Sequence, residues 1–124
     1  MSRQGLQERE YVRVMSARPV LVYCGPDQRP ISSYTVDVSG GGLLLAGPDT
    51  LRVGEQISFQ LTIAPEVPPI TGTGAVVRRD VRGRRPISFT SISDLDRRRL
   101  IRFIFECQRL ERRRGLELGD RYGN

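Results

Sequence analysis

The chain contains no histidine, no lysine and no tryptophan. Without histidine there can be no Ser-His or Cys-His nucleophile pair, and the commonest metal ligand is also missing. The two cysteines, Cys24 and Cys107, lie far apart in the sequence and show no metal-binding or redox spacing. Neither a Gly-x-x-x-x-Gly-Lys phosphate loop nor a Gly-x-Gly-x-x-Gly motif occurs. The sequence therefore predicts neither an enzyme nor a metalloprotein.

Long hydrophobic runs are also missing. No apolar stretch approaches the roughly 20 residues that span a bilayer, and residues 1–10 lack the apolar core of a secretion signal. We therefore expect a cytoplasmic protein that does not insert into membranes, with both cysteines as free thiols. A chain of 124 residues fits one domain.

All 20 basic residues are arginine, and the net charge is +6. The planar guanidinium binds a phosphate or a guanine edge through paired hydrogen bonds and stacks on flat rings. The composition therefore raises the hypothesis of a nucleotide or nucleic-acid ligand. An arginine-rich proteome would give the same bias without any ligand.

Six short β-type segments follow one another, separated by turn signals rich in Gly, Pro and Asp. They comprise residues 20–24, 31–38, 43–46, 57–63, 73–79 and 86–92. No helical pattern lies between them to make the crossovers of a parallel sheet. The pattern therefore indicates an all-β barrel or sandwich.

An amphipathic helix is predicted over residues 94–114, capped by Ser93 or Asp94 and ended by Gly115. Residues 1–8 are expected to form a flexible arm, and residues 115–124 a flexible tail. The predicted apolar face contains Leu100, Ile101, Phe103, Ile104, Phe105, Cys107 and Leu110, and the opposite face Arg98, Arg102, Glu106, Arg109 and Arg113.

Two motifs carry the functional hypothesis. Arg9 and Arg13 stand four residues apart at the entrance to the first strand, and Asp37-Val-Ser39-Gly-Gly41-Gly42 ends the second. Each motif alone is weak, because most arginine pairs are solvated and an Asp-x-Ser-x-x-Gly is usually a turn.

Together the two motifs describe a site for an anionic, guanine-bearing ligand. Two arginines can hold phosphate oxygens or the O6/N7 edge of guanine. The Asp37 carboxylate can accept hydrogen bonds from guanine N1 and N2. Ser39 offers a hydroxyl, while Gly41 and Gly42 allow backbone N–H groups to approach closely.

This order of motifs resembles the PilZ domain. The resemblance continues through Gly74-Ala-Val-Val-Arg78, the β-run to Phe89, and a closing helix with Phe103-Ile-Phe105 and Gln108-Arg109. The helix is most similar to that in the PilZ portion of flagellar-brake proteins. The resemblance implies a PilZ domain over residues 9–114, with a six-stranded antiparallel barrel at about 17–92 and the helix at about 94–114.

The resemblance further implies binding of cyclic di-GMP, as one molecule or a stacked pair. Arg9 and Arg13 would contact phosphates and guanine faces, and Asp37 a guanine edge. The remaining pocket residues would be Ser39, Gly41, Gly42 and Arg78. No metal or further cofactor is implied.

The resulting hypothesis is a cyclic di-GMP receptor that acts through an effector protein. Ligand binding would order the mobile Arg9–Arg13 arm, and the effector would control motility, adhesion or exopolysaccharide. Two alternatives stay open: a PilZ domain that binds only proteins, and a small basic barrel that binds nucleic acid. Nucleic acid is the less favoured, because Glu106 interrupts the arginine stripe and no aromatic platform interleaves with it.

Overall fold

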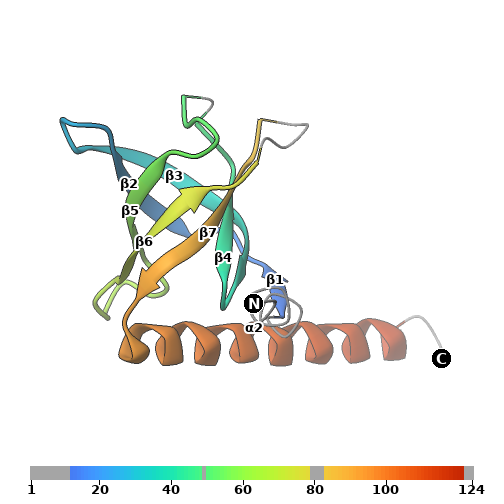
Figure 1. Ribbon diagram of the computed structural model, residues 1–124. Helices are drawn as coiled ribbons and strands as arrows, with labels where there is room; N and C mark the ends of the chain where they lie inside the picture. The colour runs from blue at the N-terminus through green and yellow to red at the C-terminus, as the bar shows by residue number, and fades with distance from the viewer. Residues whose placement is uncertain (1–11, 49, 79–82, 122–124) are drawn as a thin grey trace, which may run out of the picture.

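The computed structural model describes residues 12–48, 50–78 and 83–121, with residues 115–121 described by their backbone alone. The strands are β1 (Arg13–Met15), β2 (Pro19–Cys24), β3 (Arg29–Ser39), β4 (Gly42–Leu45), β5 (Gln56–Leu61), β6 (Ile70–Val76) and β7 (Arg85–Ile92), followed by helix α2 (Asp94–Arg121). In Figure 1 the strands form a barrel that stands on the helix.

The sheet closes on itself. Its strand order is β1-β3-β2-β5-β6-β7-β4, and β4 also pairs with β3, so that β2 to β7 form a closed barrel. All of the strand pairs are antiparallel. The predicted six-stranded antiparallel barrel with a C-terminal helix is confirmed, and the sandwich is not formed.

β1 and β2 lie end to end along the same edge of β3. Met15 is opposite Asp37 and Pro19 is opposite Tyr34, so residues 16–18 face residues 35–36 across a β-bulge. The buried Thr35 hydroxyl accepts a hydrogen bond from the bulge N–H of Arg18 at 2.8 Å and donates one to the Ser16 carbonyl. β1 is therefore a continuation of the barrel wall.

The structure adds a short strand, β1, before the predicted start of the barrel near residue 17, and β1 begins at the last residue of the predicted mobile arm. Arg13 pairs with Ser39 on β3, and the next side chain, Val14, is buried in the core. Burial of Val14 stabilises β1 by the hydrophobic effect.

The barrel interior is filled by side chains that alternate along the strands. In β5, for example, Ile57, Phe59 and Leu61 are buried while the residues between them are partly exposed. The Phe59 ring stacks on Phe89 with 5.1 Å between ring centroids. The buried core comprises Val14, Val20, Val22, Val38, Leu43, Leu45, Leu51, Ile57, Phe59, Leu61, Ile70, Val76, Ile87, Leu100 and Ile104.

Helix α2 lies across one end of the barrel (Figure 1), where its Leu100 and Ile104 join the core. The Ser93 hydroxyl accepts a hydrogen bond from the Asp96 N–H at 3.1 Å and so caps the first turn, as predicted. The Asp96 carboxylate accepts the Thr71 N–H at 3.1 Å, which fastens the start of the helix to β6.

Two predictions about the helix are wrong. Phe105 and Leu110 are 58% and 49% exposed rather than packed on the barrel, and Leu100 and Ile104 are the residues of the helix that join the core. The helix also continues through Gly115 to Arg121 rather than giving way to a tail. Glycine within a helix costs only about 1 kcal/mol relative to alanine, and no proline follows to stop it.

Within the described residues, no helix is both long and apolar enough to cross a membrane. The same part of the chain contains no cluster of three or more His, Cys, Asp or Glu side chains that could hold a metal ion. Cys24 and Cys107 are free thiols.

Candidate ligand-binding site

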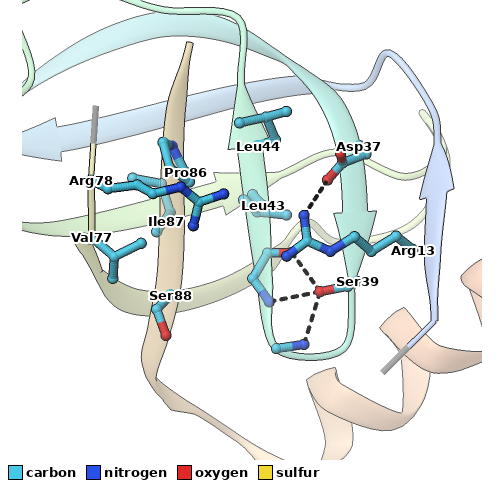
Figure 2. Close-up of a pocket in the computed structure, with 12 residues that line it drawn as sticks. Arg13, Asp37, Ser39, Leu43, Leu44, Val77, Arg78, Pro86, Ile87 and Ser88 are labelled. Atoms are coloured by element: carbon cyan, nitrogen blue, oxygen red, sulfur yellow. Dashed lines mark hydrogen bonds and ion pairs between the residues drawn. The ribbon is translucent and has the colours of Figure 1, made fainter. Parts of the chain in front are cut away.

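A pocket of about 240 Å³ lies on the outer face of the barrel, at the turn between β3 and β4 and along β7 (Figure 2). Its walls are formed by Arg13, Asp37, Ser39, Gly41, Gly42, Leu43, Leu44, Val77, Arg78, Pro86, Ile87 and Ser88. The fold thus brings together every predicted site residue except Arg9, which lies outside the described residues.

Arg13 reaches from β1 across the end of β3 toward Asp37 (Figure 2), with Nη1 of Arg13 4.0 Å from Oδ1 of Asp37. The Arg13 side chain is 65% exposed and the Asp37 side chain 20%. A contact this long at the surface contributes little stability. The guanidinium can therefore turn toward a ligand at small cost.

Burial raises the pKa of Asp37 above its ordinary value, and the positive charges of Arg13 and Arg84 offset only part of this effect. The folded protein therefore holds a carboxylate that has lost hydration without full compensation. A ligand that offers N–H donors to Asp37 would restore the lost hydrogen bonds. The guanine edge, with N1–H and N2–H side by side, has this chemistry.

Ser39 stabilises the turn between β3 and β4, which forms part of the pocket wall. Its buried hydroxyl accepts hydrogen bonds from the N–H groups of Gly41 and Gly42 at 3.2 and 3.1 Å and donates to the Gly42 carbonyl at 3.3 Å. The hydroxyl and the glycine N–H groups that the sequence suggested for a ligand are thus hydrogen-bonded to one another within the turn.

Gly42 is required by the packing of the barrel. A Cβ atom at this position would collide with the Ile87 carbonyl oxygen of the neighbouring strand β7. Since backbone atoms cannot move aside as a flexible side chain can, only glycine fits. Gly42 therefore shapes the pocket by letting β4 and β7 come close.

An apolar floor separates two arginines. Arg78 follows β6 and points into the pocket from the side opposite Arg13 (Figure 2), while Leu44 and Pro86 lie between them as a cross-strand pair. The flat base of a nucleotide ligand can lie on the apolar floor while both guanidinium groups bind the phosphates of the same ligand. No sequence motif marks this floor, because it depends on the register of β4 with β7.

Comparison with known proteins identifies the family. The PilZ domain model matches residues 7–106, and the chain belongs to the PilZ domain family. No individually curated protein matches the chain.

Several solved structures share the fold. The PilZ domain of YcgR from Escherichia coli, determined with c-di-GMP, has 19% identity and a TM-score of 0.66, covering 88% of this chain and 98% of that one. YcgR in complex with c-di-GMP has 18% identity and a TM-score of 0.74, covering 89% of this chain and 50% of that one.

The inhibitor of motility from Bacillus subtilis has 21% identity and a TM-score of 0.68, covering 82% of this chain and 51% of that one. The present chain thus spans about half the length of the two longer proteins. At these identities the likeness shows the fold, and function must be argued from the pocket.

Proposed function

We propose that this protein is a receptor for cyclic di-GMP that signals to an effector protein. The observation that carries the proposal is the meeting of Arg13 and Asp37 at the rim of one pocket, from two different strands. Arginine suits the phosphates and the guanine faces, and the carboxylate suits the guanine N1 and N2 donors. Arg78 adds a second cation on the opposite wall.

Membership of the PilZ family supports this proposal, as do structural neighbours determined with c-di-GMP. The neighbour from Bacillus subtilis is an inhibitor of motility, which supports motility as one setting for the effector. Adhesion and exopolysaccharide production are the other outputs that we propose. A receptor of this kind binds its ligand without transforming it.

We further propose that Arg9 completes the site and that ligand binding orders the segment before β1. Arg13 is already fixed by its strand, so any ordering concerns the residues that precede it. Backbone ordering costs about 1–2 kcal/mol per residue, which charge-assisted hydrogen bonds of about 1.5–3 kcal/mol each can offset. Amide exchange of residues 6–11 should slow at saturating ligand. Unchanged exchange would contradict the ordering step alone.

Calorimetry tests the receptor proposal. Cyclic di-GMP, cyclic di-AMP, cyclic GMP and GTP are titrated into the wild-type chain, Arg13→Ala and the control Arg98→Ala, which removes an exposed arginine of α2. We expect saturable binding of cyclic di-GMP alone, lost in Arg13→Ala and unchanged in the control. The fitted stoichiometry distinguishes one ligand from two. No binding by the wild type would favour a PilZ domain that acts through protein contacts only.

A further inference from the structure

A third arginine lies immediately before β7, the strand that forms one side of the pocket. Strand β7 begins at Arg85, and Gly83, in the left-handed region at φ 74°, turns the chain just before it. Between them stands Arg84, a half-buried residue that neither sequence motif includes.

The sheet register directs Arg84 toward the ligand side of the barrel wall. Side chains alternate along a β-strand, and Pro86 and Ser88 line the pocket together with Ile87 between them. Arg84 stands two residues before Pro86, so the same alternation, continued one residue before the start of β7, assigns Arg84 to their face. Asp37 is opposite Leu44, which in turn is opposite Pro86, so a single row of neighbours joins Asp37 to the Arg84 end of β7.

The backbone at Arg84 is held firmly by the next residue. The buried Arg85 donates a hydrogen bond from Nε to the Leu51 carbonyl at 2.8 Å and another from Nη1 to the Arg84 carbonyl at 3.1 Å. Arg85 therefore anchors the start of β7 and fixes the backbone position from which the Arg84 side chain extends. A side chain presented from a fixed backbone position loses little freedom on binding.

We infer that Arg84 is a further ligand-binding residue, which contacts a phosphate from the β7 side while Arg13 contacts the ligand from the β1 side. The inference rests on the proposed function and extends it. Arg84 is close enough to Asp37 for its charge to lower the pKa of that carboxyl group, as the charge of Arg13 does. Once Asp37 binds a guanine edge, both arginines are free to turn toward the phosphates between them.

The experiment compares Arg84→Gln and Arg84→Lys with the wild type and with Arg98→Ala as the matched control. Glutamine keeps most of the packed stem and removes the charge, whereas lysine keeps the charge and removes the fork. Cyclic di-GMP affinity is measured by calorimetry at two salt concentrations, after thermal melting has shown that each variant is folded. The Asp37 pKa is followed by NMR in the free proteins.

For Arg84→Gln we expect at least tenfold weaker binding, about 1.4 kcal/mol, and a shallower salt dependence, because one phosphate contact is lost. Arg84→Lys should fall between Arg84→Gln and the wild type, and Arg98→Ala should bind within twofold of the wild type. In the free protein, Arg84→Gln should raise the pKa of Asp37 further.

Wild-type affinity in both Arg84 variants, with the wild type itself binding, would overturn the role of Arg84 and leave the receptor proposal intact. Absence of binding by the wild type would overturn both. A salt dependence identical in Arg84→Gln and the wild type would also contradict a phosphate contact, even if affinity fell.

Discussion

The hydroxyl of Thr35 accepts a hydrogen bond from the backbone N–H of Arg18 at 2.8 Å, in the bulge that separates β1 from β2. The same hydroxyl donates to the Ser16 carbonyl, so one buried side chain satisfies both backbone groups. This arrangement holds β1 in line with the barrel. It thereby sets the position of Arg13 over Asp37.

Thr35→Val should destabilise the protein by about 1–3 kcal/mol, because the partly buried Arg18 N–H and Ser16 carbonyl would lose their partner while the side-chain volume stays similar. Urea unfolding measures the change in free energy. Thr73→Val is the matched control, since the Thr73 hydroxyl forms a hydrogen bond with the exposed Thr90 hydroxyl at 2.9 Å. Equal losses in the two variants would contradict a special role for Thr35.

Asp37→Asn should leave the stability at pH 7 unchanged or raise it, because burial disfavours the charged carboxyl of the folded protein and raises its pKa. Affinity for cyclic di-GMP should nevertheless fall at least tenfold, about 1.4 kcal/mol, since the amide offers only one acceptor to two guanine donors. Urea unfolding and calorimetry on the same variant separate the two effects. A marked loss of stability would show that Asp37 is structural.

The pH dependence has a definite sign. Because the pKa of Asp37 is higher in the folded protein than in the unfolded chain, the folded state takes up the proton first as the pH falls. As the pH falls through the titration of Asp37, wild-type stability should therefore rise relative to Asp37→Asn, while ligand affinity falls. Arg13→Ala should move the range to higher pH, since the Arg13 charge lowers the pKa of Asp37.

Unfolding and ligand titrations from about pH 7 to pH 4 cover the relevant range. An affinity that stays constant until the pH falls below about 3.9, the ordinary pKa of aspartate, would contradict the account. The Asp37→Asn variant serves as the control, and its affinity should not change with pH over this interval.

Asp96→Ala should loosen the start of α2 from the barrel. The carboxylate of Asp96 accepts the Thr71 N–H at 3.1 Å and pairs with Arg99 at 2.9 Å, so the variant loses both contacts. We expect about 1–3 kcal/mol lower stability and faster amide exchange at Thr71. Asp27→Ala, in an exposed turn, should change neither. Exchange at Thr71 that matches the wild type would contradict this anchor.

Much of the fold could be predicted because its signals are local. The alternation of Ile57, Phe59 and Leu61 marks β5, and proline and glycine mark the ends of several strands. Strand β1 could not be predicted in this way, since it has only three residues and is held by long-range pairing and by Val14. The strand predicted over residues 73–79 is Ile70–Val76 in the structure, since Ile70 is already buried.

The candidate site was predictable where a motif names residues and unpredictable where strand register decides. The motif spacing singled out Asp37 and Arg13, and in the structure Nη1 of Arg13 lies 4.0 Å from Oδ1 of Asp37. The roles of Ser39 and Gly42 changed, because hydrogen bonds within the turn and contact with β7 use the groups that the motif offered. Arg84 carries no local signal, since only the β4–β7 register brings it near Asp37.

The measurement that tests the account most directly is NMR mapping of backbone amide shifts during a titration of the wild-type chain with cyclic di-GMP. We predict that the largest changes fall on Arg13, Asp37, Gly41 and Ser88, which share the pocket. The exposed face of α2 around Arg98 and Arg102 should stay unchanged. Changes centred on that arginine-rich face instead, or no change at saturating ligand, would contradict the assignment of this pocket as the cyclic di-GMP site.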